Sequence, residues 1–150
     1  MTDLFAPLTF TRGPAMKNRF MLAPLTNCQS HEDGRLSDEE FRWLTLRAAG
    51  GFGLTMTCAS HVQAQGRGFP GQLGIFSDAH VEGLSRLAAA IRSNGSIAVA
   101  QLHHAGMRAP AALTGSLGSP TPSSARSAAS NARAGSPRAR KTELSWRHTP

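Results

Sequence analysis

The chain has 150 residues, with 16 Lys or Arg against 9 Asp or Glu and a formal net charge of +7, a length that suits one domain of ordinary size. No apolar run approaches the roughly 18 residues of a membrane-spanning helix, and the first residues, Met-Thr-Asp-Leu, lack the basic and apolar segments of a signal peptide. Because two cysteines are too few for a disulfide framework, we expect a cytoplasmic protein with no membrane partner.

The first predicted elements are a turn and a short strand. Gly13 and Pro14 form a turn signal between residues 8–11 and 15–16, which predicts a small hairpin at one end of the fold. Residues 20–23 (Phe-Met-Leu-Ala) are continuously apolar and end at Pro24. Such a run is typical of a buried parallel strand.

A helix is predicted after this strand. Ser37 and Glu40 have the spacing of a capping box, with the serine at the N-cap and the glutamate three residues later. The glycine pair at 50–51 ends the helix. Three apolar residues fall on one face of it: Phe41, Leu44 and Ala48.

The pattern then runs through a strand, a helix and a strand. Residues 53–58 predict a second strand, followed by a long polar and glycine-rich loop over 59–76. A second helix is predicted from Ser77 to the Asn-Gly pair at 94–95, and residues 97–100 predict a third strand. The apolar stripe of the second helix consists of Val81, Leu84, Leu87, Ala88 and Ile91.

The β-α-β-α-β order indicates parallel strands joined by right-handed helical crossovers. An open doubly wound sheet and the opening of a (β/α)8 barrel both have this order. A dinucleotide-binding sheet would carry G-x-G-x-x-G after its first strand, whereas this chain has Pro-Leu-Thr-Asn-Cys at 24–28. The long loops after the first two strands favour the barrel, whose chemistry lies at the carboxyl ends of its strands.

Polar residues cluster at all three predicted strand ends: 24–28, 58–61 and 101–104. In a barrel these ends are neighbours, so we expect the clusters to line one pocket. The Gln101 amide, the Thr26 hydroxyl and backbone groups near Pro24 and Ala59 would make a neutral hydrogen-bonding wall. Such a wall suits a planar heterocycle better than a phosphate. On residue type alone Thr26 is better interpreted as a turn hydroxyl, whereas a buried Gln101 amide needs partners.

The other reactive residue types receive plainer interpretations. Cys58 is interpreted as a core thiol because no base is identifiable near it, and His104 as a structural residue that bonds a loop backbone. Neither His103 nor His104 has a His or carboxylate at ligand spacing, so no metal site is expected. Three residues are interpreted as solvated loop side chains: His61, Arg67 and Arg108.

Five stretches carry a family resemblance through their order and spacing. They are LFAPL at 4–8, MKNRFMLAPLT at 16–26, QGR at 65–67, GQLGIFSD at 71–78 and AQLHHAG at 100–106. Together they resemble the N-terminal part of the Old Yellow Enzyme family, the FMN-dependent NAD(P)H:flavin oxidoreductases and ene-reductases. The resemblance covers residues 1–110 and implies an α/β fold, the opening β-α-β-α-β portion of a truncated (β/α)8 TIM barrel. It also implies FMN as cofactor, NADH or NADPH as reductant and a small electron-poor alkene as substrate of the complete enzyme.

The resemblance also implies which residues contact the cofactor. Thr26 would lie near the O4/N5 edge, where a hydroxyl hydrogen bond tunes the flavin potential; Ala59 would approach the pyrimidine side by its backbone, and the Gln101 amide would bind the N3/O2 edge. One subgroup has a redox-tuning cysteine in place of Thr26, but Cys28 lies two residues later and does not take over that role. No catalytic residue is assigned. Four residues would pass along the flavin ring: Ala23, Pro24, Leu25 and Thr26.

The regular pattern ends near Leu117. Residues 1–117 hold ten Lys or Arg and eight Asp or Glu, whereas residues 118–150 hold six and one. Ser, Ala, Arg and Pro dominate the second range, which predicts a disordered, low-complexity tail. Our hypothesis is that a frameshift within residues 113–119 interrupts one barrel domain.

Two functional expectations follow. The resemblance implies that the substrate-orienting His pair and the phosphate site belong to later strands, so an FMN-dependent NAD(P)H oxidoreductase fragment is expected to be inactive alone. The alternative is a non-catalytic binding protein whose basic tail contacts nucleic acid or an anionic membrane. The tail lacks a nucleic-acid motif and interleaved aromatic residues, which disfavours nucleic acid as a partner.

Overall fold

The computed structural model describes residues 3–115. The tail at 118–150, with its predicted disorder and frameshift, lies outside the described residues. Among the described helices, none combines the length and the apolar character that a membrane crossing requires. The main elements are β1 (Met21–Leu22), α1 (Asp38–Ala49), β2 (Leu54–His61), α2 (Val81–Ser93) and β3 (Ile97–His103). Shorter helices are η1 (Ala64–Gly66), η2 (Asp78–His80), η3 (Gly106–Arg108) and α3 (Ala111–Thr114).

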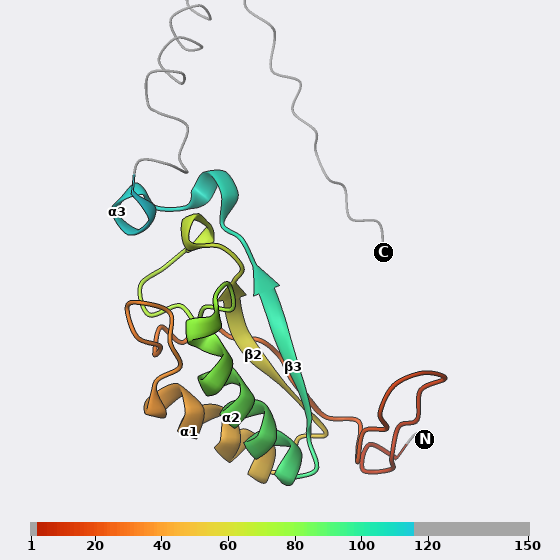
Figure 1. Cartoon of the computed structure of the whole chain (residues 1–150). Coiled ribbons are helices and arrows are strands. Elements are labelled where there is room, and N and C mark those ends of the chain that lie inside the picture. Colours follow the sequence, from red (N-terminus) through yellow and green to blue (C-terminus); the bar gives the residue numbers. More distant parts are fainter. Residues whose placement is uncertain (1–2, 116–150) are drawn as a thin grey trace, which may run out of the picture. The chain divides into compact units, whose positions relative to one another are not determined.

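The three strands form one parallel sheet in the order β1-β2-β3, and β2 and β3 are labelled in Figure 1. Leu22 pairs with Thr55, and Thr55 pairs with Ala98 on the next strand. The two helices that connect the strands lie side by side and pack on the sheet. The predicted β-α-β-α-β order with parallel strands is therefore confirmed.

An apolar cluster between the helices and the sheet holds this unit together. Leu44 and Ala48 on α1 are fully buried, and Leu87 and Ile91 on α2 are almost so. They pack with Leu22 of β1, and burying a leucine or isoleucine side chain stabilises a fold by roughly 1.5–3 kcal/mol. The predicted faces of both helices are thus confirmed at their centres, but Val81 at the start of α2 is 57% exposed.

The N-terminal segment contacts the end of the sheet where the strands begin. Leu8 and Met16 exchange two backbone hydrogen bonds of 3.0 and 2.9 Å, which confirms the predicted hairpin. The Asn18 side chain donates to the carbonyl of Gly51 after α1, and Lys17 Nζ donates to the carbonyl of Asn94 after α2. The hairpin is thereby tied to the ends of both helices.

Four boundary predictions need correction. β2 and β3 reach His61 and His103, three residues beyond their predicted ends, whereas β1 keeps only two of its four predicted residues. The loop predicted over 59–76 is shorter, and its end pairs with the sheet through a bridge between His61 and Gly74. The predicted strands were too short because Ser60, His61, Gln101 and His103 are polar and lie outside the apolar runs. In the structure β2 and β3 continue through these residues.

Only half of the predicted capping box forms. The Ser37 hydroxyl accepts a hydrogen bond of 3.0 Å from the backbone N–H of Glu40, as an N-cap should. The Glu40 side chain is fully buried and contacts Ser30 instead of the N-cap backbone. Because the Glu40 side chain is buried against the loop before α1, it does not form the second hydrogen bond of the motif, the one to the backbone N–H of Ser37.

Removal of the N-cap should lower stability measurably. We expect Ser37→Ala to reduce the free energy of unfolding by about 1 kcal/mol, because the N–H of Glu40 loses its acceptor. Urea denaturation followed by circular dichroism measures the change. Ser85→Ala, at an exposed position within α2, is the matched control, and equal effects of the two substitutions would contradict the cap.

Candidate functional site

The carboxyl ends of β2 and β3 are aligned by one extra residue in β2. Met56 pairs with Val99, but the next regular pair is Ala59 with Gln101, so β2 uses three residues where β3 uses two. Side chains alternate between the faces of a strand, and an extra residue reverses that alternation. Ala98 packs against the helices, and Gln101, an odd number of residues later, faces the other way. Ala59, its partner, therefore shares the face of Gln101.

The segment after β1 runs alongside the same end of the sheet. Ala23, Leu25 and Thr26 are exposed, with Leu25 at 55%, and Pro24 is half-buried. The backbone of Leu25 lies close to the Cys58 thiol on β2. All six predicted cofactor contacts thus lie at the carboxyl ends of neighbouring strands: Ala23, Pro24, Leu25, Thr26, Ala59 and Gln101.

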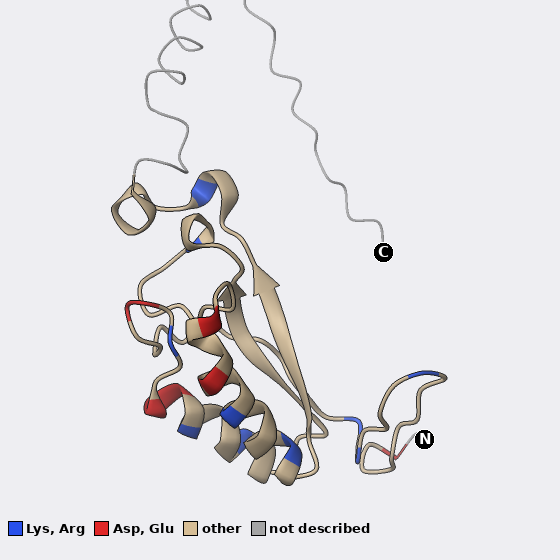
Figure 2. Ribbon diagram, in the orientation of Figure 1, with Lys and Arg blue, Asp and Glu red and all other residues tan. Residues whose placement is uncertain are grey.

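The chemistry of this wall is neutral and open. Within residues 3–115 the side chains of Thr26 and Gln101 make no hydrogen bond, so a hydroxyl and an amide remain available to a ligand. The Gln101 backbone N–H donates to the Thr57 hydroxyl at 3.1 Å, which fixes the backbone there. Charged residues lie on the helices and loops, whereas β2 and β3 carry none (Figure 2).

A buried carboxyl lies behind the segment that follows β1. Glu40 is fully buried and accepts a hydrogen bond from the Ser30 hydroxyl. Burial raises the pKa of Glu40, and the hydrogen bond from the Ser30 hydroxyl opposes that rise. The carboxyl thereby connects α1 to the loop that carries Thr26.

The interpretation of Cys58 as a core thiol is confirmed. The residue is 2% exposed, and burial raises the pKa of its thiol to about 12, to which the neighbouring Glu40 carboxylate adds. A thiol with such a pKa stays protonated and is a poor nucleophile. The contact with Glu40 was not predictable from the sequence, because the two residues lie on different elements.

Two of the three residues interpreted as solvated are instead buried. Arg67 is 9% exposed and pairs with Glu32 at 2.7 Å, which ties the loop after β2 to the loop before α1. His61 is 3% exposed because β2 extends through it, whereas Arg108 is exposed as predicted.

His104 is structural as predicted, since its Nδ1 accepts from the Gly106 N–H at 2.9 Å. No group of His, Cys, Asp or Glu within residues 3–115 could hold a metal ion.

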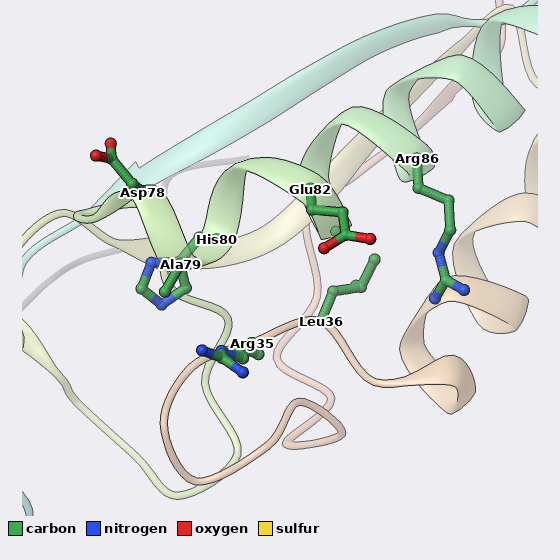
Figure 3. A pocket seen from close by; sticks show the side chains of 8 residues that line it. Arg35, Leu36, Asp78, Ala79, His80, Glu82 and Arg86 are labelled. Carbon is green, nitrogen blue, oxygen red and sulfur yellow. The ribbon is translucent and has the colours of Figure 1, made fainter.

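A separate pocket of about 370 Å³ lies at the start of α2 (Figure 3). Its charged side chains have opposite signs, and Arg86 already pairs with Asp38 at 2.7 Å. His80 is held by the Ser77 hydroxyl at 2.9 Å. None of the predicted cofactor contacts lines this pocket, so it is a different place from the neutral wall.

Comparison with known proteins shows similarity to one family of flavin oxidoreductases. It matches the NADH:flavin oxidoreductase / NADH oxidase family over residues 3–148. It is 39% identical over 110 residues to the probable NADH-dependent flavin oxidoreductase YqiG of Bacillus subtilis (strain 168), covering 73% of this chain and 29% of that protein. It is 37% identical over 109 residues to the NADH:acrylate oxidoreductase of Vibrio harveyi, covering 73% of this chain and 11% of that one.

The fold is similar to that of a solved relative. The old yellow enzyme homologue from Zymomonas mobilis matches 78% of this chain with a TM-score of 0.71 and 31% identity, and the match covers 32% of its own length. The described unit is therefore the opening β-α-β-α-β portion of a (β/α)8 barrel, as predicted. The chain belongs to the NADH:flavin oxidoreductase / NADH oxidase family, whose members use FMN with NADH or NADPH. It spans about a third or less of the length of these relatives.

Replacing the buried carboxyl should remove a pH dependence of stability. Because burial raises the pKa of Glu40 in the folded chain, protonation of this residue favours folding. That contribution is complete below the pKa of the unfolded state and is lost as pH rises through the folded pKa. The free energy of unfolding of the wild type should therefore fall across this window relative to that of Glu40→Gln, measured by urea denaturation at stepped pH.

Glu82→Gln supplies the matched control for this measurement, because Glu82 is exposed on α2. It should keep the wild-type pH profile. Parallel profiles for the wild type and Glu40→Gln would show that the buried carboxyl does not titrate with folding.

Proposed function

We propose that this chain supplies a wall for the flavin ring of FMN in an NAD(P)H-dependent oxidoreductase of the Old Yellow Enzyme type. The observation that carries this proposal is the gathering of Ala59, Gln101 and residues 23–26 at one end of the parallel sheet. All of them are exposed or half-buried, so a ligand can reach them.

The donor set supports a flavin rather than an anion. A flavin ring has imide and ring-nitrogen edges that need both donors and acceptors, and the Gln101 amide offers both. The Thr26 hydroxyl offers a third group, and Leu25 adds 55%-exposed apolar surface beside it. β2 and β3 carry no Lys or Arg that would favour a phosphate at this place.

Each residue has a defined task in this proposal. The Gln101 amide binds the N3/O2 edge and fixes the orientation of the ring, while the Thr26 hydroxyl donates to the O4/N5 edge and favours the more electron-rich form. Ala59 keeps the backbone close to the pyrimidine side. FMN, when bound, would supply the two-electron redox chemistry by which NADH or NADPH reduces an electron-poor alkene. The name of one relative, NADH:acrylate oxidoreductase, is consistent with that substrate class.

We further propose that the described residues do not turn over substrate by themselves. Within 3–115 we assign no side chain to substrate orientation, and the resemblance puts the His pair and the phosphate site on later strands. A cytoplasmic location and a division of the chain at residue 117 stay predictions from the sequence.

Loss of the Gln101 amide should weaken FMN binding. In titrations of the 150-residue chain followed by flavin fluorescence, Gln101→Ala should raise the Kd about tenfold, which is the usual effect of one lost hydrogen bond. Gln65→Ala, at an exposed position in the loop after β2, should bind as the wild type does. Equal affinities of the two variants would count against the wall, and steady NADPH oxidation by the wild type would refute the lack of turnover.

A further inference from the structure

A buried glutamine on the loop after β2 joins the ends of both strands that carry the proposed wall. Gln72 is fully buried, and its Nε2 donates to the carbonyl oxygen of Ala59 at 2.9 Å. The same nitrogen lies 3.0 Å from Nδ1 of His103 on β3. Its Oε1 accepts from the backbone N–H of Gly68 at 2.7 Å. One side chain therefore spans β2, β3 and the loop between β2 and α2.

The orientation of this amide has one solution. If the amide were turned over, Oε1 would face the Ala59 carbonyl oxygen and the NH2 group would face the Gly68 N–H. Both contacts would then join like groups, because a backbone carbonyl only accepts and a backbone N–H only donates. Nε2 must therefore donate to Ala59 and has its second hydrogen for His103.

The amide orientation also determines the state of the histidine. Because Gln72 donates to Nδ1 of His103, that nitrogen is an acceptor, and the neutral ring carries its proton on Nε2. Within residues 3–115 the Nε2 atom makes no hydrogen bond. His103 lies two residues after Gln101 on β3, so its side chain is on the same face of the strand.

The backbone around Gln72 holds the side chain in place. The neighbouring Leu73 carbonyl accepts from the N–H of His61 at 2.9 Å, and the N–H of Ile75 donates back to the His61 carbonyl at 3.0 Å. On the other side, the carbonyl of Gly71 accepts from the Ser30 N–H at 3.0 Å. Gly71 has φ of +63°, and a Cβ there would collide with the Cys28 carbonyl. The amide is thus presented from a segment that is fixed on both sides.

We propose that Gln72 is a positioning residue of the flavin site: it holds Ala59 beside β3 and keeps His103 as the Nε2–H tautomer on the face of Gln101. The role at the flavin rests on the function proposed above, whereas the tautomer does not. A glutamate at this position could still accept from Gly68, but it has no hydrogen for Ala59 or for His103 Nδ1. The structure therefore requires the amide and not only a side chain of this size.

The tautomer gives a readout that a purely structural role would not change. Long-range ¹H–¹⁵N spectra of the histidine rings in the 150-residue chain distinguish the two neutral forms, with the His103 signals identified by their loss in His103→Gln. We expect Nε2–H in the wild type and Nδ1–H in Gln72→Glu, where a carboxylate faces that nitrogen. Gln65→Glu, the same change at an exposed position in the same loop, should keep Nε2–H.

Two results would overturn the proposal. An Nδ1–H ring in the wild type would do so without any variant, and so would an unchanged His103 ring in a folded Gln72→Glu.

FMN titrations of the same proteins separate this proposal from the proposed function. If the wild type binds FMN, Gln72→Glu should raise the Kd about tenfold relative to Gln65→Glu, and equal affinities would refute positioning at the flavin. If the wild type binds no FMN, the proposed function fails while the spectra still decide the role of Gln72.

Discussion

One extra residue in β2 decides which side chains reach the proposed site. Up to Met56 the strand keeps strict register with β3, and Thr55 and Ala98 are paired on the side of the helices. With continued alternation, Ala59 would also face the helices. The irregularity between Met56 and Ala59 reverses this and puts Ala59 beside Gln101 on the opposite face. The neutral wall therefore depends on a local break in the sheet.

Apolar and polar side chains stabilise different parts of the unit. On one side Leu22, Leu44 and Leu87 bury apolar surface and fix the helices. At the carboxyl ends, buried polar side chains fix the loops, with Glu40 connecting α1 to the loop after β1 and Gln72 connecting β2 to β3. A buried amide whose partners are all present is rigid, which is what a site needs when its own groups must stay free for a ligand.

The elements with strong apolar periodicity were predictable from the sequence, and the polar contacts between elements were not. The helix faces at Leu44 and Ile91 and the parallel order of strands follow from local pattern. The full lengths of β2 and β3 do not, because Ser60, Gln101 and His103 continue the strands through partners on neighbouring strands. The burial of Glu40, Arg67 and Gln72 depends on residues that are distant in the sequence. The place of the candidate wall was predictable from the sequence, because the carboxyl ends of neighbouring parallel strands lie together.

We propose that the carboxyl ends of β1, β2 and β3 form a surface for a flavin ring. Titration of FMN into the ¹⁵N-labelled chain, followed by amide and side-chain signals, locates the residues that FMN contacts. We expect the largest shifts at Leu25, Thr26, Ala59 and the Gln101 side chain. Shifts concentrated instead on Arg35 and Arg86, which line the charged pocket at the start of α2, would contradict it.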